Sequence, residues 1–266
     1  MKPPKKLIIP IFIPQYGCQH NCVFCNQEKI TSKTVQPTPG DINKTVYSHL
    51  STWKGRGEKE IAFYGGTFTS IDIAIQEELL SCAYSFIRKG LINAVRVSTR
   101  PDAIDNKRLN ILKRYGVSTV ELGVQSMDDN VLRMSGRGHS SGDVMNSVRL
   151  LKQNGFKTGI QVMPGLPGDT TDTILYTAHK VISLTPDFIR IYPTIIIKDT
   201  PLEKMYLQGL YKPWSLEDMV TVCRDIMRLF ERFSIAVIRV GLQPTAGLMK
   251  NIVAGPFHPS FRQLLA

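Results

Sequence analysis

The sequence predicts an α/β protein built around a partial, open β/α barrel of the TIM type. Three observations predict this fold: a chain of 266 residues, short β-rich runs that alternate with longer segments of helical periodicity, and polar residues that recur on one face of the strand candidates. A complete β/α barrel takes about 250 residues. Strands that alternate with helices of about 10–15 residues indicate βαβ units and therefore a parallel sheet.

The strand candidates are short runs rich in β-branched and other apolar residues. They comprise residues 7–13, 60–64, 94–98, 119–124, 158–163, 188–193 and 236–240. Between them, apolar residues recur at intervals of three and four, which is typical of amphipathic helices. The helix candidates comprise residues 41–53, 73–89, 106–115, 141–154, 171–184 and 215–233. Three of them end at a glycine (Gly90, Gly116 or Gly155), where a left-handed residue terminates many helices.

Alternation within the strand candidates predicts what fills the barrel, because successive side chains of a strand point to opposite faces. In residues 95–100, Val95 and Val97 share one face and Arg96, Ser98 and Arg100 share the other. The polar face continues along later strands in Glu121, Gln125, Arg190, Tyr192, Arg239 and Gln243. Packed barrels are normally filled with branched apolar residues, so a polar interior predicts a binding site. The alternative is a two-sided sheet with solvated edges, although parallel strands are usually buried on both faces.

The charge balance favours a polyanionic partner. Lys and Arg number 33 against 22 Asp and Glu, a formal net charge of +11, which suits RNA or a phosphorylated cofactor. No apolar run approaches the roughly 20 residues that span a bilayer. Prolines interrupt the apolar opening segment, and no signal-peptide cleavage site follows it. We therefore expect a cytoplasmic protein without a membrane partner.

The cysteines indicate a metal site. Cys18, Cys22 and Cys25 lie within eight residues, directly after the first strand candidate. An odd number of cysteines, five, with three crowded together, argues against a disulfide framework and for metal binding in a reducing compartment. Three thiolates can bind three irons of a [4Fe–4S] cluster and leave the fourth iron open for chemistry.

The alternative is a structural zinc site, and with it a non-enzymatic zinc or RNA-binding module. Structural zinc takes four ligands, and His20 is the candidate for the fourth. It lies between two of the cysteines, where a short loop can hardly wrap a tetrahedron. The remaining cysteines, Cys82 and Cys223, lie in helix candidates, and we expect them to be small buried residues.

The motif Cys-x-x-x-Cys-x-Phe-Cys after the first strand of a βα series resembles that of the radical S-adenosylmethionine (SAM) superfamily. Within it, the chain is most similar to the radical-SAM domain of the elongator catalytic subunit and its short bacterial relatives. The matching segments, in that family's order, are residues 98–102 (STRPD), 121–126 (ELGVQS), 136–139 (GRGH), 163–168 (MPGLPG), 191–194 (IYPT) and 239–243 (RVGLQ). Oxygen-independent coproporphyrinogen III oxidases share fewer of these elements.

Two departures from the elongator subunit limit what the resemblance implies. The sequence has no room for an acetyltransferase domain, and its cysteine loop has the compact spacing of the superfamily rather than an expanded one. Acetyl-CoA-dependent modification is therefore not implied. Relatives continue beyond the segment similar to residues 255–259. We expect a radical SAM partial barrel over residues 1–240, followed by a truncated C-terminal segment, 241–266.

The resemblance implies a [4Fe–4S] cluster and SAM as cofactors, with Cys18, Cys22 and Cys25 as the iron ligands. The SAM contacts that it implies are Phe24 at the adenine, Gly65, Gly66 and Thr67 at the methionine amino group, Ser98, Gln125 and Arg137 near the ribose and carboxylate, and Gln161 at the ribose. Thr67 replaces the usual glutamate, so a backbone role is favoured there. Without the resemblance, Phe24 would pack the loop, Ser98 would cap a helix and Arg137 would be a solvated charge.

Polar residues on later strands lie beyond the SAM positions. Arg190, Tyr192, Arg239 and Gln243 are assigned to the substrate or to the barrel floor. The lone loop histidines, His139 and His258, are expected at the surface. The sequence identifies no residue that reacts with the substrate and gives no oligomeric state.

The resemblance implies reductive cleavage of SAM to methionine and a 5′-deoxyadenosyl radical that abstracts hydrogen from the substrate. An external donor of the flavodoxin or ferredoxin type would supply the electron. The basic composition and the elongator resemblance favour tRNA as the substrate. The alternative is a small molecule, such as a tetrapyrrole or a carboxylated metabolite held by Arg190 and Arg239.

Overall fold

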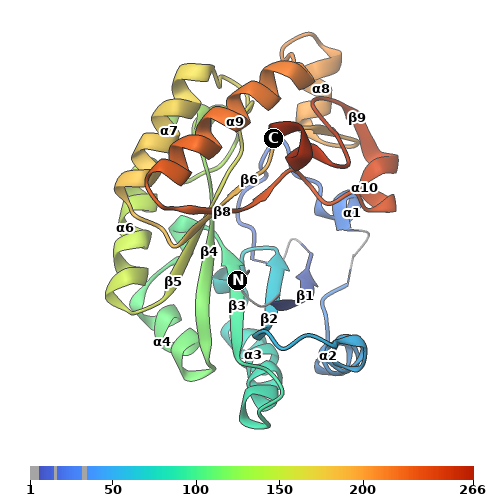
Figure 1. The fold of residues 1–266 in the computed structure, drawn as a ribbon, viewed down its shortest axis with the longest axis vertical. Helices are drawn as coiled ribbons and strands as arrows, with labels where there is room; N and C mark the ends of the chain where they lie inside the picture. The colour runs from blue at the N-terminus through green and yellow to red at the C-terminus, as the bar shows by residue number, and fades with distance from the viewer. Residues whose placement is uncertain (1–5, 15–16, 32–34) are drawn as a thin grey trace.

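The fold is a curled, seven-stranded parallel sheet. The computed structural model describes residues 6–14, 17–31 and 35–266. Its main sheet has the strand order β1-β2-β3-β4-β5-β6-β8 (Figure 1). The strands are β1 (Leu7–Ile13), β2 (Lys59–Gly65), β3 (Ala94–Thr99), β4 (Val117–Gln125), β5 (Lys157–Val162), β6 (Phe188–Ile191) and β8 (Ala236–Val240). Among the described residues β1 does not pair with β8, so the predicted open, partial barrel is confirmed.

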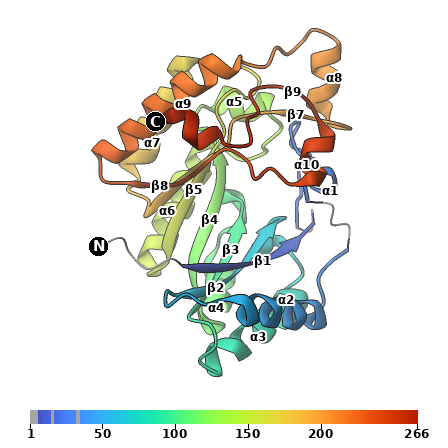
Figure 2. The same ribbon diagram turned by 45° about the vertical axis from the view of Figure 1, so that its right-hand side comes forward.

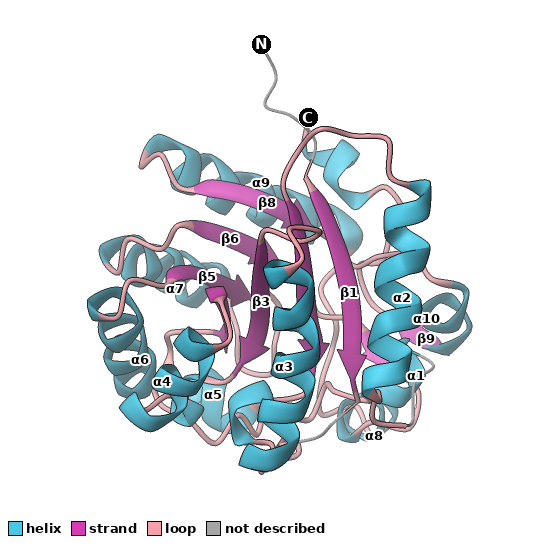
Figure 3. Ribbon diagram, turned by 90° about the horizontal axis from the view of Figure 1, so that it is seen from below, coloured by secondary structure: helices cyan, strands magenta, loops and turns pink. Residues whose placement is uncertain are grey.

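The six long helices cover the convex side of this sheet (Figure 3). They are α2 (Pro39–Thr52), α3 (Ile73–Arg88), α4 (Asn106–Arg114), α6 (Ser141–Gln153), α7 (Thr171–Ser183) and α9 (Leu216–Arg232). All seven strand candidates and six helix candidates are confirmed, with ends that shift by at most two residues. Gly90, Gly116 and Gly155 adopt positive φ values of 67°, 70° and 77° at helix ends, as predicted.

The aliphatic faces of the strands pack against these helices. Val95 and Val97 of β3 are fully buried in one apolar cluster with Leu80 of α3 and Leu109 of α4. Burying each such side chain contributes about 1.5–3 kcal/mol. Cys223 is also fully buried in this cluster, as expected, whereas Cys82 is only half-buried. The packed outer layer makes the barrel a rigid support for the loops at its ends.

The edge strand β1 carries a proline. The Leu7 amide donates to Glu58 and the Ile13 carbonyl accepts from Gly66, so alternate residues from 7 to 13 direct their backbone groups toward β2. Pro10 belongs to the alternate set of residues, 8, 10 and 12, whose backbone groups face away from β2. Because proline has no N–H, this position cannot donate to a further strand. The free edge of β1 therefore lacks one backbone N–H donor for pairing with another strand.

Short elements gather beyond the carboxyl ends of the strands (Figures 1 and 2). They are α1 (Gln27–Thr31), α5 (Asp129–Met134), α8 (Pro201–Leu207), α10 (Ala246–Asn251), the antiparallel pair β7 (Ile196–Ile197) and β9 (Ile252–Ala254), and 3-10 turns at Phe68–Ser70, Pro101–Ala103 and Phe261–Leu265. The amide of Asn251 donates to the Lys29 carbonyl at 3.2 Å, and Ile30 packs beside Ile197 and Leu248. The C-terminal segment thus contacts the region that follows the cysteine loop.

Candidate cofactor site

A cavity of about 700 Å³ opens at the carboxyl ends of the strands. Because the seven strands are parallel, the loops that follow them meet at this end. The cavity is lined by every residue predicted to hold the cluster or SAM: Cys18, Cys22, Phe24, Cys25, Gly65, Gly66, Thr67, Ser98, Gln125, Arg137 and Gln161. These residues come from the loop after β1, the end of β2 and the turn after it, the strands β3, β4 and β5, and the loop between α5 and α6, so the fold brings together positions that are far apart in sequence.

The cysteine loop is compact and braced against the barrel. Cys22 is buried, Cys25 is half-buried and Cys18 is exposed, with its Sγ 3.4 Å from the Thr67 hydroxyl. The Cys25 amide donates to the Cys22 carbonyl at 3.1 Å. Burial, reinforced by the other two cysteines, raises the pKa of the Cys25 thiol to about 12. Metals bind the thiolate, so metal binding at this loop must release that proton.

Within the described part of the chain, the cysteines and His20 do not form a convergent ligand set for one ion. Among the described residues, no three His, Cys, Asp or Glu side chains converge on a point that could hold a single ion. His20, the candidate fourth ligand for zinc, instead faces Asp102, with Nε2 3.7 Å from Oδ2. A tetrahedral zinc site requires convergent ligands. Cysteines that each bind a different iron of a cluster do not have to meet at one point.

Two buried guanidinium groups contact the buried cysteine. Arg137 Nη1 lies 3.1 Å from Cys22 Sγ, and Arg100 Nη1 lies 3.9 Å from the same sulfur. Arg100 is held by two hydrogen bonds to Asp102, at 2.9 and 3.0 Å, and also donates to the backbone carbonyl of Arg137. Sequence reasoning assigned Arg100 only to the polar face of its strand. The sequence signal for this role is the spacing of Arg100 and Asp102, an arginine two residues before an aspartate directly after a strand.

Unpartnered polar atoms show that the cavity suits a polar ligand. Ser98 Oγ, Gln125 Oε1 and Arg137 Nε are buried and have no hydrogen-bond partner within the described part of the chain. All three residues line the cavity. Leaving a buried polar group unpaired costs about 1–3 kcal/mol, and a ligand with hydroxyl, amino and carboxylate groups would remove that cost. The donor and acceptor set therefore fits SAM.

The backbone at Gln125 is strained. This residue ends β4 with φ = +71°, at a register irregularity in the β4–β5 pairing. A left-handed conformation disfavours a residue with a side chain, and such strain is concentrated at functional sites. The Gln125 carbonyl accepts from the Met163 amide at 2.9 Å, which helps to hold the conformation. The strained turn directs the amide side chain to the cavity.

The end of β2 requires glycine. Gly65 has φ = +110°, and a Cβ there would lie 2.6 Å from the Ile13 carbonyl oxygen. The Gly66 amide donates to the same oxygen at 2.6 Å. The Gly65 carbonyl accepts from the side-chain amide of Gln27, and its second lone pair can still accept from an ammonium group.

The polar interior predicted from strand alternation is confirmed as a buried ion-pair network. Arg190 Nε lies 2.8 Å from Glu121 Oε2, and Arg96 Nη1 lies 2.7 Å from Glu121 Oε1. Arg96 also reaches Glu60, at 2.7 Å. Arg190 therefore pairs inside the barrel and does not line the cavity, whereas its neighbour Tyr192 does; their Nη1 and hydroxyl oxygen are 3.1 Å apart.

The other polar residues of the later strands lie elsewhere. Arg239 lines a separate hollow beside Arg262, and its Nε donates to the Gly241 carbonyl at 3.2 Å. Gln243 is exposed beyond β8. The structure thus brings one of the four substrate candidates, Tyr192, to the cavity.

The predicted surface position of His139 is wrong. The side chain is 6% exposed, and its Nε2 lies 3.3 Å from the Val124 carbonyl. Positive φ values at Gly136 and Gly138 turn the chain back beneath β4, a path that the sequence pattern does not reveal. Burial, with Arg137 and Arg100 nearby, lowers the pKa of His139 to about 3. His258 is half-buried, and its Nδ1 accepts from the Ser260 amide at 3.1 Å.

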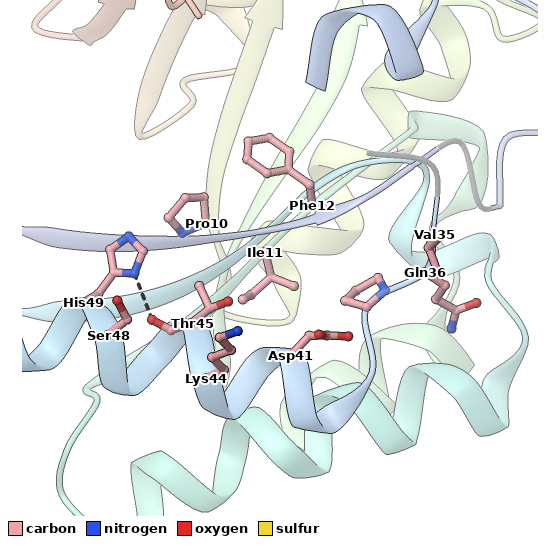
Figure 4. A pocket seen from close by; sticks show the side chains of 11 residues that line it. Pro10, Ile11, Phe12, Val35, Gln36, Asp41, Lys44, Thr45, Ser48 and His49 are labelled. Atoms are coloured by element: carbon pink, nitrogen blue, oxygen red, sulfur yellow. Dashed lines mark hydrogen bonds between the residues drawn. The ribbon is translucent and has the colours of Figure 1, made fainter. Parts of the chain in front are cut away.

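A second hollow, of about 740 Å³, lies between β1 and α2 (Figure 4). Two of its polar side chains are used in local structure: His49 Nδ1 donates to the Thr45 carbonyl at 2.9 Å, and Asp41 accepts from the Thr38 amide and hydroxyl at the start of α2. None of the predicted cofactor residues lines it. Although it is slightly larger, it lacks the thiols and unpartnered polar atoms of the first cavity.

An open parallel barrel with a three-cysteine loop at the carboxyl end of its first strand defines the class of protein, an iron–sulfur enzyme scaffold. The chain belongs to the radical SAM superfamily, whose family model matches residues 12–181. A model described as the Radical_SAM C-terminal domain matches residues 186–266.

Similar proteins confirm the elongator resemblance. A tRNA uridine(34) acetyltransferase of Dehalococcoides mccartyi is 29% identical over 246 residues, which is 80% of this chain and 54% of that protein. Human elongator complex protein 3 is 34% identical over 138 residues, 51% of this chain and 25% of that protein. The chain thus spans about half or less of the length of these relatives.

Solved structures agree on the fold. The archaeal Methanocaldococcus infernus Elp3 with an N-terminal deletion superposes with a TM-score of 0.75 at 22% identity, covering 98% of this chain and 61% of that one. Coproporphyrinogen III oxidase from Escherichia coli gives 0.59 at 18% identity, covering 86% and 53%. Within the described residues, no helix is long and apolar enough to cross a membrane.

Proposed function

We propose that this chain holds a [4Fe–4S] cluster through Cys18, Cys22 and Cys25 and binds SAM beside it. The proposed substrate of the enzyme is tRNA. When bound, these groups supply a 5′-deoxyadenosyl radical, formed with one electron from a donor of the flavodoxin or ferredoxin type. The observation that carries the proposal is the single cavity lined by the three thiols together with the unpartnered atoms of Ser98, Gln125 and Arg137.

The chain's own residues would bind and orient SAM. The free Nε of Arg137 suits a carboxylate, because a guanidinium group donates in a fixed plane. The Ser98 hydroxyl and the Gln125 carbonyl oxygen suit ribose hydroxyls and amino groups. Phe24 lines the cavity between two of the cysteines and offers an aromatic face to adenine. Gly65 leaves its carbonyl close to the space for the methionine amino group.

Apolar residues would keep the reaction dry. Phe24 packs with the buried side chains of Ile196, Leu202 and Tyr211, and this cluster supports one wall of the cavity. Excluding water protects a reactive intermediate from side reactions and strengthens electrostatic contacts. The short elements after β6 therefore form part of the wall of the cavity, together with the loops after the first strands.

The experiment compares two cysteine variants after anaerobic reconstitution with iron and sulfide. Cys22→Ala removes a proposed ligand, and Cys82→Ala is the control, because it removes a half-buried thiol that lies on α3 away from the cavity. We expect Cys22→Ala to lose most of its iron and all 5′-deoxyadenosine formation from SAM under strong reductant. The control should keep both. Iron content and SAM cleavage that are unchanged in Cys22→Ala would overturn the ligand assignment, and a purified protein that holds one zinc would overturn the function.

Support for a tRNA substrate comes from composition and relatives. The formal net charge is +11, and the similar proteins include tRNA uridine(34) acetyltransferases. Acetyl transfer is not part of the proposal, since those names belong to proteins that this chain matches only in part. Binding to tRNA should weaken steeply between 50 and 200 mM salt, because phosphate contacts release counterions (about 10³-fold or more for six or more contacts).

The same titration tests the alternative substrate class. If the affinity for tRNA is weak and independent of salt, and tRNA leaves deoxyadenosine formation unchanged, a small-molecule substrate is favoured. The buried pairing of Arg190 with Glu121 makes that alternative weaker, because this arginine is already neutralised inside the barrel. Arg239 pairs with no carboxylate in the described part of the chain, but it lies outside the main cavity.

A further inference from the structure

The contacts of Cys22 differ from those of the other two cysteines of the loop. Its sulfur lies within hydrogen-bond reach of two guanidinium groups, Arg137 at 3.1 Å and Arg100 at 3.9 Å. Cys18 instead contacts the neutral hydroxyl of Thr67. Both arginines are nearly buried, 5% and 6% exposed, so solvent screens their charges little.

Arg100 is fixed in place by its other contacts. Asp102 accepts from its Nε and Nη2 at 2.9 and 3.0 Å, and the backbone carbonyl of Arg137 accepts from Nη2 as well. His20 Nε2 lies 3.7 Å from Oδ2 of Asp102, the same oxygen that accepts from Arg100 Nη2. Arg137 is anchored in turn by the Gly123 carbonyl. The two cations are therefore held beside Cys22 by the turn after β3, by the Gly123 carbonyl of β4 and by the contact of Arg100 with the Arg137 backbone.

The local charge beside Cys22 is positive. Two guanidinium groups face the sulfur and one carboxylate, Asp102, partly neutralises the more distant of them. A one-electron reduction adds one negative charge to a cluster and its thiolates. Positive charges and N–H donors close to a ligand sulfur stabilise that reduced state more than the oxidised state, and hydrogen bonds to sulfur are a known determinant of cluster potentials.

We propose that Arg100, oriented by Asp102, is a positioning residue that acts with Arg137 on Cys22 to raise the reduction potential of the cluster and ease its reduction by a flavodoxin- or ferredoxin-type donor. In this step the donor loses one electron, the oxidised cluster gains it, and no bond or proton moves. The inference rests on the proposed function, since it requires that Cys22 is an iron ligand.

The test is an anaerobic potentiometric titration of the reconstituted protein, followed by electron paramagnetic resonance of the reduced cluster. Arg100→Gln removes the charge and most of the donors. The matched control is Arg114→Gln, which changes the net charge equally but lies at the end of α4, exposed and paired with Glu77 at 2.9 Å. We expect Arg100→Gln to disfavour reduction at least tenfold, a shift of about 59 mV to a more negative potential. The control should match the wild type.

Arg100→Lys serves if the glutamine variant fails to retain iron. An ammonium group keeps the charge but cannot hold Asp102 through two parallel bonds and still reach the sulfur. We expect its potential to be more negative than that of the wild type. A loaded variant, Gln or Lys, that has the wild-type potential overturns the inference. If the wild-type protein itself holds no [4Fe–4S] cluster, the proposed function fails instead, so the two failures are distinguishable.

Discussion

Glu121 on β4 and Arg190 on β6 form an ion pair inside the barrel, with Oε2 and Nε 2.8 Å apart and the carboxylate fully buried. Arg96 approaches the other oxygen of Glu121 at 2.7 Å. The carboxylate of Glu121 thus partly neutralises two guanidinium groups, one from β3 and one from β6. The strands that carry the cavity are joined by charge as well as by backbone hydrogen bonds.

Glu121→Ala should strongly destabilise the fold. Removing the shared carboxylate leaves Arg96 and Arg190 buried with less negative charge, and breaking a buried pair in this way costs about 3–5 kcal/mol. Urea denaturation monitored by circular dichroism measures the loss. The control is Glu77→Ala, which breaks an exposed pair with Arg114 and should cost less than about 1 kcal/mol. Similar losses in both variants would show that the Glu121 network does not stabilise the barrel.

The sequence predicted the polar interior but not its pairing. Strand alternation determines the face on which Arg190 or Glu121 lies, because side chains alternate with a period of two. It does not give the depth along the barrel or the partner, since these depend on the register between strands. The sequence therefore leaves open whether Arg190 contacts the substrate or lies on the barrel floor; in the structure it pairs with Glu121 inside the barrel, and its neighbour Tyr192 lines the cavity.

The long elements and the cysteine motif are visible in the sequence for a related reason. Helices of 9–17 residues carry enough apolar positions to show periodicity, and the cysteine spacing is local. Elements such as α1 and α10, of five and six residues, are too short for a periodic signal, and tertiary contacts such as that of Asn251 with Lys29 hold them. The buried position of His139 likewise depends on the two glycine turns around Arg137.

The strain at Gln125 predicts a stability difference between two substitutions that both remove its amide. In Gln125→Gly the φ of +71° is no longer strained, whereas Gln125→Ala keeps the strain. Allowing for the higher entropy of unfolded glycine, we expect the glycine variant to be more stable by up to about 1 kcal/mol. Both should bind SAM more weakly than the wild type, as measured by calorimetry. An alanine variant as stable as the glycine variant would argue against strain.

The close approach of β1 and β2 makes Gly65 sensitive to a single methyl group. A Cβ at Gly65 would lie 2.6 Å from the Ile13 carbonyl, in addition to the strain of φ = +110°. Gly90→Ala is the control, because φ there is +67° but nothing lies within 4 Å of the new Cβ. We expect a loss of about 1–2 kcal/mol for the control and at least about 1 kcal/mol more for Gly65→Ala. Equal losses in urea titrations would mean that the strand end moves aside freely.

Asp169 should make the fold less stable as the pH rises from about 4 to about 6. Burial raises the pKa of this carboxyl from 3.8 to about 6, even though the Gly165 amide and the Thr173 hydroxyl donate to it. In that window the folded state holds a proton that the unfolded state has lost, so folding takes up a proton, and this uptake becomes less favourable as the pH rises. The free energy of unfolding of the wild type, relative to Asp169→Asn, is therefore expected to fall with rising pH and to level off above about 6.

Asp143 gives the opposite sign and serves as the comparison. Hydrogen bonds from the Ser140 amide and hydroxyl at the start of α6 lower the pKa of Asp143, so its stabilising contribution is present above the usual carboxyl range and is lost as the pH falls through it. Relative to Asp143→Asn, the wild type should gain stability with rising pH, below about pH 4. Urea midpoints measured from acid to neutral pH for both pairs test this contrast. Slopes of the same sign for the two carboxyls would contradict the assignment of burial as the dominant effect at Asp169.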